Sequence, residues 1–204
     1  MKTFKASVLV ALLLSVAAIG PVFAKGKIVG YVEPKNAVNP APVMALNTFQ
    51  RFEITPIAMD APYAGQPANE DAKGGIQRNL DQDVQPMLAE WNAKPVEGAA
   101  RTLKIEPTIR HIKFVGTAAR IWVGGWAGGS AVLMTVKLSD AQTGELIAEP
   151  EFYQHADKRG GTWTFGATDR AMLVRVATMI SDYLQKNYST AVGGSTSVAP
   201  DAKS

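Results

Sequence analysis

A short run of glycine and tryptophan contains the residue types best suited to a functional contact. Trp122 precedes this run, which reads Gly124-Gly125-Trp126-Ala127-Gly128-Gly129. Glycine permits close backbone approach, and tryptophan offers a large amphipathic surface. The run therefore predicts a flexible, aromatic-tipped loop that binds a partner, a membrane surface or a neighbouring subunit. The alternative is a glycine-rich connection between strands whose tryptophans cover the edge of the core.

The chain has two histidines, His111 and His155, that could ligate a metal or carry a proton. Catalytic zinc needs at least three protein ligands held in one place. The candidate carboxylates Glu106, Asp140 and Asp157 do not stand at a recognised spacing from either histidine. We therefore expect surface or hydrogen-bonded histidines, and no metal or other cofactor.

Two further patterns could suggest hydrolysis, but neither supports it. Ser130 follows Gly129, yet the segment lacks the final glycine of a nucleophile elbow and no helix is predicted after it. Asp81 and Asp83 stand two residues apart on a predicted helix, so they point to different sides. No catalytic residue is assigned from the sequence.

The first 24 residues have the pattern of a secretory signal peptide. Lys2 and Lys5 precede a short apolar run, and small residues precede a cleavage point between Ala24 and Lys25. The run is shorter than the roughly 20 residues that a membrane-spanning helix needs. We expect a periplasmic or secreted protein with no transmembrane span in the mature chain.

Charge and cysteine content restrict the partners of the mature chain. The sequence has 21 basic and 18 acidic residues, and removing Lys2 and Lys5 leaves 19 against 18. This near-neutral balance gives no electrostatic footprint for nucleic acid. The absence of cysteine excludes disulfides, a thiol nucleophile and a lipid anchor on an N-terminal cysteine.

The mature sequence divides into three parts by composition. Residues 25–46 are rich in proline, glycine and asparagine without a sustained period, and are predicted to be a linker or loosely attached N-terminal arm. Residues 47–188 have the length and patterning of a single domain. Residues 189–204 carry glycine, serine and few large apolar groups, which predicts a disordered tail.

Hydrophobic periodicity predicts the first elements of the domain. Residues 49–59 read as a strand that Pro56 confines to a sheet edge or ends. Apolar residues then recur at three- and four-residue steps over 76–91, which predicts an amphipathic helix. Pro86 lies inside this pattern and predicts a kink or a division into two short helices.

The second half of the domain reads as three strands and a helix. Residues 103–114 alternate in strand period, but the apolar set changes face near Arg110 and His111, which predicts a bulge. Residues 132–139 form a clear strand, and residues 145–153 return from a turn as its hairpin partner. Thr168 is the predicted N-cap of the last helix, with Asp169 in its first turn.

This order of elements predicts an α+β fold. We expect a mixed or antiparallel sheet of about four strands with two helices packed on one face.

From residue 102 onward a set of turn and strand features follows in a fixed order: Ile105-Glu106-Pro107, Ala119-Arg120, the glycines of 124–129 with Ser130, Asp140-Ala141, Thr143-Gly144-Glu145, Gly160-Gly161, and Gly166 with Asp169. Residues 49–59 and Asn79-Leu80-Asp81 fit an extended version of the pattern. In the order of these features, over roughly residues 47–188, the sequence resembles a family of exported bacterial proteins known as the domain of unknown function numbered 4410. The resemblance implies export, and in many members lipidation, but no activity and no catalytic residue. This chain departs from the lipidated pattern because it has no cysteine to acylate.

Together these observations favour a non-enzymatic, envelope-associated binding or assembly module. Its sheet edge and its glycine-tryptophan loop would bind an envelope protein or a second copy. The alternative is a small-molecule-binding protein or hydrolase with a cleft near Arg110, His111 and Arg120.

Overall fold

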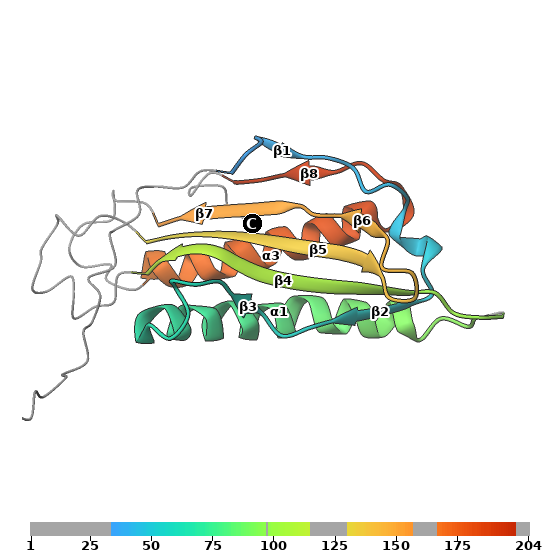
Figure 1. The fold of residues 1–204 in the computed structure, drawn as a ribbon, viewed down its shortest axis with the longest axis horizontal. Coiled ribbons are helices and arrows are strands. Elements are labelled where there is room, and N and C mark those ends of the chain that lie inside the picture. Colours follow the sequence, from blue (N-terminus) through green and yellow to red (C-terminus); the bar gives the residue numbers. More distant parts are fainter. Residues whose placement is uncertain (1–33, 97, 115–129, 157–166, 199–204) are drawn as a thin grey trace, which may run out of the picture.

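The computed structural model describes residues 34–96, 98–114, 130–156 and 167–198. Within them a six-stranded mixed sheet carries two helices on one face (Figure 1). The predicted α+β class with two helices on one face is confirmed. The sheet has six strands where about four are predicted, because two predicted strands are each divided at a proline.

The first division is at Pro56. Strands β2 (Arg51–Ile54) and β3 (Ala58–Met59) both pair in parallel with β4 (Thr102–Lys113). Pro56 lies between them, and proline has no amide hydrogen to give to the ladder. The prediction that this proline limits pairing and marks a sheet edge is confirmed.

The second division is at Pro150. Strands β6 (Leu146–Ala148) and β7 (Glu151–His155) both pair antiparallel with β5 (Ala131–Asp140). The Pro150 carbonyl still accepts a hydrogen bond from Val136 N at 3.0 Å. The predicted hairpin partner of β5 is therefore two short strands on one edge.

Strand β4 contains the predicted bulge. Its register with β5 shifts between Ile109 and His111. The extra residue, Arg110, is exposed, and the shift keeps both Ile109 and Ile112 in the core beneath the helices. His111 consequently turns to the opposite face, across from Leu133.

The first helix, α1, spans Pro67–Asn92 without a break. The alternative of two short helices is therefore wrong. Pro86 is exposed, so the carbonyl that loses its partner can be hydrated, while Val84 and Leu88 hold the opposite face in the core. Packing of the apolar stripe outweighs one missing hydrogen bond.

The second helix, α3, spans Ala167–Ser189 and packs against α1. It begins one residue before Thr168, so the prediction of Thr168 as N-cap is wrong, whereas Asp169 lies in the first turn as predicted. The predicted apolar face is buried, with Met172, Val176 and Ile180 fully covered. No helix of the described residues is long and apolar enough to cross a membrane.

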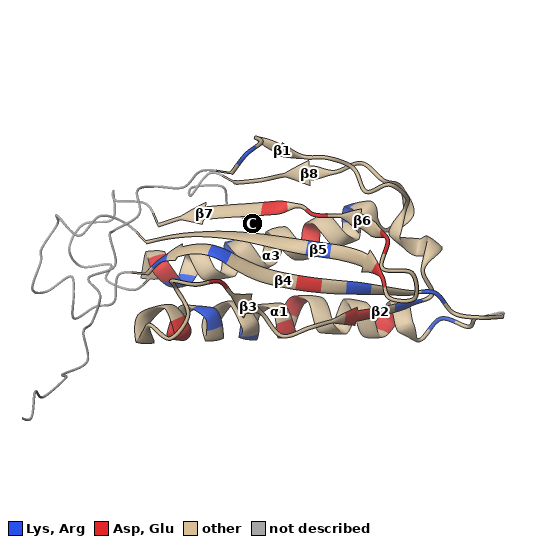
Figure 2. Ribbon diagram, viewed as in Figure 1, with Lys and Arg blue, Asp and Glu red and all other residues tan. Residues whose placement is uncertain are grey.

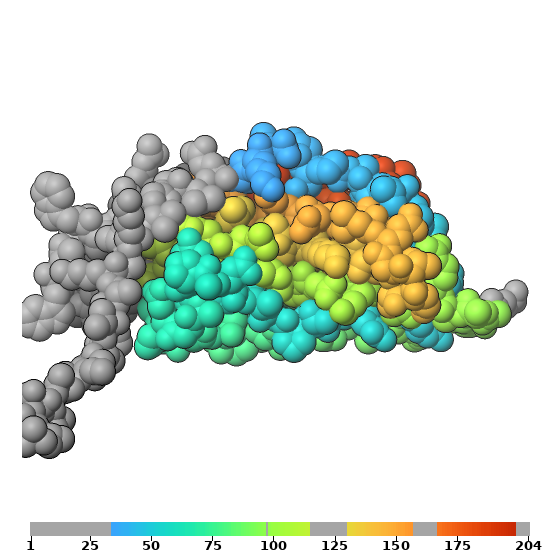
Figure 3. All heavy atoms as spheres, in the orientation of Figure 1, coloured from blue at the N-terminus to red at the C-terminus, as the bar shows by residue number. Residues whose placement is uncertain are grey.

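Residues before and after the domain also pack onto it. Strand β1 (Val38–Asn39) pairs antiparallel with β8 (Gly194–Ser195), and the short helix η1 (Leu46–Thr48) buries Leu46. We call residues 34–46 the arm and residues 190–198 the tail. Figure 3 shows the arm, in blue, covering the edge above β6 and β7.

The predicted disorder of residues 189–204 does not hold for the tail. The buried amide of Asn187 accepts hydrogen bonds from Val192 N and Gly193 N, both at 2.8 Å, and donates to Gly193 O at 3.1 Å. Thr196 is also buried, and Tyr153 N donates to its carbonyl at 2.7 Å. Local polar partners, rather than apolar burial, therefore order this segment. The predicted loose attachment of the arm likewise gives way to a paired strand.

The contact between the two helices depends on a small residue. A Cβ atom at Gly75 of α1 would stand 2.7 Å from Leu173 Cδ1 of α3, which is closer than atoms pack. At the neighbouring Gly74 it would meet only the end of the Arg78 side chain, at 3.5 Å. The two glycines thus share a helix but differ in packing.

We predict that Gly75→Val lowers the free energy of unfolding by about 1–3 kcal/mol more than Gly74→Val does, because only Gly75 faces a filled core. The change in helix propensity is the same for both, so their difference isolates packing. Urea unfolding of the two variants measures it. Equal losses would contradict this close approach of α1 and α3.

Candidate functional site

Several residues singled out in the sequence lie outside the described residues. They are the loop residues Trp122, Gly124, Gly125, Trp126, Gly128 and Gly129, the cleavage point between Ala24 and Lys25, and Arg120 of the alternative cleft. Their roles stay predictions.

His111 is engaged by the loop that leads into α1. The imidazole is 6% exposed, and Nδ1 is hydrogen-bonded to the Tyr63 hydroxyl. The two rings meet edge to face with centroids 4.9 Å apart. Burial lowers the pKa of His111 and raises the pKa of Tyr63. Burial therefore favours the uncharged form of His111, and the hydrogen bond to Tyr63 agrees with the expectation of a hydrogen-bonded histidine.

Arg110 is held by the same loop. Its guanidinium forms an ion pair with Asp60 at 3.1 Å, and Asp60 N donates to Ile109 O at 3.0 Å. Arg110 and His111 therefore fasten the loop to the bulge of β4. This use of both side chains gives no support to a substrate cleft at this place.

One hollow among the described residues lies elsewhere, between α3 and β8. It holds about 50 Å³ and is lined by Met179, Tyr183, Lys186, Gly194 and Val198, among others. Sites for small molecules usually measure about 300–1,000 Å³. This hollow has room for water molecules rather than for a metabolite.

Asp157 lies outside the described residues, and the other candidate metal ligands are dispersed. Glu106 bonds Lys104 at 2.8 Å on the outer sheet face, and His155 stacks on Tyr153 in β7. Within the described ranges, no three histidine or carboxylate side chains are grouped to hold a metal ion. Basic and acidic residues are interspersed along the strands and helices (Figure 2).

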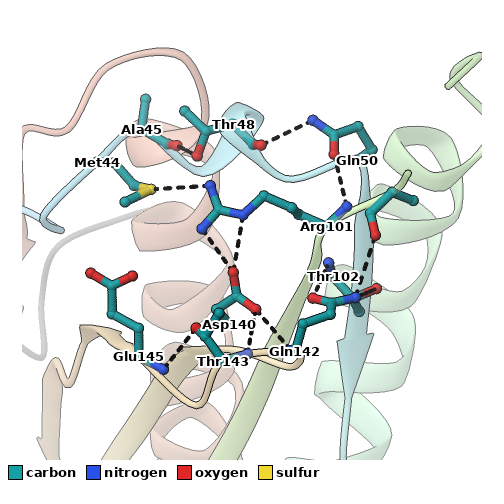
Figure 4. A network of polar contacts seen from close by, with 11 residues as sticks. Met44, Ala45, Thr48, Gln50, Arg101, Thr102, Asp140, Gln142, Thr143 and Glu145 are labelled. Carbon is teal, nitrogen blue, oxygen red and sulfur yellow. Dashed lines mark hydrogen bonds and ion pairs between the residues drawn. The ribbon is translucent and has the colours of Figure 1, made fainter. Parts of the chain in front are cut away.

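Asp140 is the centre of a polar network among the described residues (Figure 4). Its side chain is 1% exposed, and Oδ2 accepts hydrogen bonds from Arg101 Nε at 3.0 Å and Nη2 at 2.7 Å. Oδ1 accepts from the backbone N–H groups of Gln142 at 2.8 Å and Thr143 at 3.1 Å. The hydrogen bond from Arg101 lowers the pKa of Asp140 against the opposing effect of burial.

Arg101 extends this network to the segment between the arm and β2. Its guanidinium lies 4.6 Å from the centre of the Phe49 ring, and its backbone exchanges hydrogen bonds with Gln50 at 2.9 and 3.0 Å. The network therefore joins the start of β4, the end of β5 and the segment before β2. Both oxygens of Asp140 are occupied by protein groups, so this carboxylate serves structure rather than proton transfer. From the sequence, Asp140 is a candidate metal ligand without a recognised spacing, and Arg101 is not singled out.

One edge of the sheet is closed by an asparagine of the arm. Asn39 Nδ2 donates to Glu151 O at 2.7 Å, and Glu151 N donates to Asn39 Oδ1 at 2.7 Å. Two such bonds to one residue reproduce a rung of an antiparallel ladder. The side-chain amide thus takes the place of a neighbouring strand beside β7.

The opposite edge is closed by an asparagine of α1. Phe52 N donates to Asn92 Oδ1 at 2.8 Å, and Asn92 Nδ2 donates to Phe52 O at 2.9 Å. Further along, Ile57 N donates to Gln77 Oε1 at 2.9 Å. The roles of Asn39 and Asn92 are not identified from the sequence, because no residue spacing around a single asparagine indicates a contact with a sheet edge.

Comparisons with known proteins show no match to a family model and none to a curated protein. Solved structures with a partly similar fold include a PelC dodecamer from Paraburkholderia phytofirmans, 16% identical, which covers 67% of this chain and 89% of that one with a TM-score of 0.34. A putative lipoprotein from Caulobacter crescentus is 15% identical, covering 65% and 86%, with a TM-score of 0.31. A DUF330 protein from Xanthomonas campestris is 13% identical, covering 72% and 88%, with a TM-score of 0.35. At these values the likenesses establish neither a family nor a function, and membership in group 4410 is not confirmed.

We predict that Asp140→Asn lowers the free energy of unfolding at pH 7 by about 1.5–3 kcal/mol, the usual worth of a hydrogen bond to a charged group. The lowered pKa of Asp140 means that this stabilisation is present above the unfolded-state pKa of about 3.9 and is lost as the pH falls through the folded-state value. The difference between the two proteins should therefore shrink in acid, as measured by urea unfolding at several pH values.

The control for this prediction is Glu106→Gln, which removes a partly exposed carboxylate from its ion pairs with Lys104 and Lys137. That change should cost at most about 1 kcal/mol at pH 7. Equal losses in the two variants would contradict a central role for Asp140.

Proposed function

We propose that the protein is an exported, non-enzymatic binding or assembly module of the cell envelope, and that it acts in the periplasm. The signal-peptide pattern of residues 1–24 supports export. The engagement of Asp140, His111 and Arg110 in contacts that hold the fold together supports a binding role over a catalytic one. The glycine-tryptophan loop remains a candidate contact of this module.

The observation that favours binding most directly is a set of exposed apolar side chains at one end of the sheet. We call Val43, Leu146 and Val192 the apolar patch, and they are 67%, 50% and 60% exposed. Val43 N donates to Ile147 O at 3.0 Å, which places Val43 beside Leu146. Val192 precedes Gly193, which lies against the backbone of Pro40 and Ala41. Grouped apolar residues on a surface are typical of interaction sites.

The sheet edges themselves are a weaker candidate for direct binding. Asn39 and Asn92 already satisfy the outward peptide groups of Glu151 and Phe52. A partner strand would have to displace one of them. We therefore expect a partner to bind the apolar patch and the loop rather than a free sheet edge.

We predict that the double substitution Val43→Lys and Leu146→Lys reduces crosslinked adducts of this protein in intact cells by at least about tenfold. Burying a valine or leucine side chain contributes about 1.5 kcal/mol or more, and 1.4 kcal/mol is about tenfold in affinity. Trp126→Ala, tested alongside, reports separately on the loop.

Val174→Lys is the matched control, because Val174 is also exposed (47%) but lies on α3 outside the patch. It should leave the adducts unchanged. If the double lysine variant and Trp126→Ala both keep the adducts of the original protein, the proposed binding role of the patch and the loop is wrong.

A further inference from the structure

The two asparagines that close the sheet edges belong to segments that are packed into the fold to different degrees. Asn92 is the last residue of α1, a 26-residue helix whose apolar stripe is buried. Asn39 belongs to the arm, and it is the one buried residue between 34 and 41. Its neighbours Lys35, Asn36, Ala37 and Val38 are all exposed. Asn39 can thus leave β7 far more easily than Asn92 can leave β2.

Hydrogen bonds, rather than apolar burial, hold this part of the arm. Besides the two bonds between Asn39 and Glu151, Lys35 N donates to Glu151 Oε2 at 2.8 Å and Tyr183 Oη donates to Pro40 O at 3.0 Å. Each such bond contributes a net of only about 0.5–1.5 kcal/mol, because water replaces it when it opens. Local release of the arm therefore costs much less than unfolding.

Every one of these partners stands far from the arm in sequence. Glu151 is 112 residues from Asn39, and Tyr183 is 143 residues from Pro40. β1 also pairs with β8 near the other end of the described chain, with Val38 opposite Ser195. The same contacts can therefore be made by the arm of another molecule without any new chemistry.

The connection between the exchangeable residues and the rest of the chain is short and stiff. Pro40 and Pro42 flank Ala41, and Val43 is already fixed to Ile147. Proline confines the backbone to extended conformations, and short hinges of restricted geometry favour exchange between molecules. The hinge is thus residues 40–42.

From these observations we infer that the arm is exchangeable, and that two copies of this chain form a dimer in which residues 34–39 of each copy cover β7 of the other. The partner is a second copy, because a second copy supplies the complement already seen: Asn39 for Glu151 and Val38 for Ser195. The inference goes beyond the proposed function, since arm exchange needs neither the apolar patch nor the loop to bind a foreign partner.

A pair of engineered cysteines tests this exchange, and the natural chain has no cysteine to interfere. Val38→Cys and Ser195→Cys place thiols on directly opposed residues of β1 and β8. Opposed antiparallel residues lie about 4.5–5.5 Å apart at Cα, within the range that a disulfide spans. The protein is unfolded, refolded at low and high concentration, oxidised, and separated on a non-reducing denaturing gel.

Exchange predicts a covalent dimer whose fraction rises with refolding concentration, and an internally bridged monomer at low concentration. Two controls isolate the arm. Thr108→Cys with Thr135→Cys, an opposed pair of β4 and β5, should give the monomer at every concentration. Val38→Cys alone should give far less dimer than the pair.

Internally bridged monomer at every concentration would overturn the inference, and so would equal dimer from Val38→Cys alone. A hinge variant, Pro40→Gly, should lower the dimer fraction of the cysteine pair, because a flexible hinge lets the arm fold back. The lysine substitutions in the apolar patch should leave that fraction unchanged, so failure of the exchange and failure of the proposed function are distinguishable.

Discussion

An open β-sheet leaves a row of peptide groups without strand partners along each outer strand, and the fold of this chain depends on how those groups are satisfied. On one side, Asn92 and Gln77 of α1 bond Phe52 and Ile57. On the other side, Asn39 of the arm and Thr196 of the tail bond Glu151 and Tyr153. A buried peptide group without a partner costs about 1–3 kcal/mol. The arm and the tail are therefore parts of the domain rather than appendages to it.

The same constraint shapes the remaining contacts. Arg101 and Asp140 join the segment between the arm and β2 to β4 and β5, so the chain enters the sheet from a fixed direction. Asn187 turns the tail back from the end of α3 toward β1. Side chains that could otherwise do chemistry are thus committed to holding strand ends and loops in place. This commitment is the physical reason for favouring a binding or assembly role.

The architecture was largely predictable from local patterns. The change of apolar face near Arg110 located the bulge of β4, because side chains alternate strictly along a strand. Pro56 correctly marked an edge, and the helical stripes on α1 and α3 are buried as their spacing predicts. The alternative of two helices divided at Pro86 is wrong, because an exposed proline in a well-packed helix removes one hydrogen bond without ending the helix.

The arm, the tail and the edge contacts could not be predicted in this way. Asn39 finds Glu151 across 112 residues, and neither has a neighbour whose type or spacing signals the pair. Low apolar content predicts disorder for residues 189–204, but within the tail, residues 190–198, the buried amide of Asn187 orders the chain. The roles of the candidate site residues could not be predicted either. The adjacent Arg110 and His111 suggest a cleft from the sequence. The sequence does not show that His111 bonds Tyr63 and that Arg110 pairs with Asp60.

The central claim is that side-chain amides close both edges of the sheet, and hydrogen exchange of single backbone amides tests it most directly. The amides of Phe52 and Glu151 point away from their neighbouring strands, so only Asn92 and Asn39 can protect them. We predict slow exchange at both positions, lost at residue 52 alone in Asn92→Ala and at residue 151 alone in Asn39→Ala. Fast exchange at both amides in the unaltered protein would contradict it.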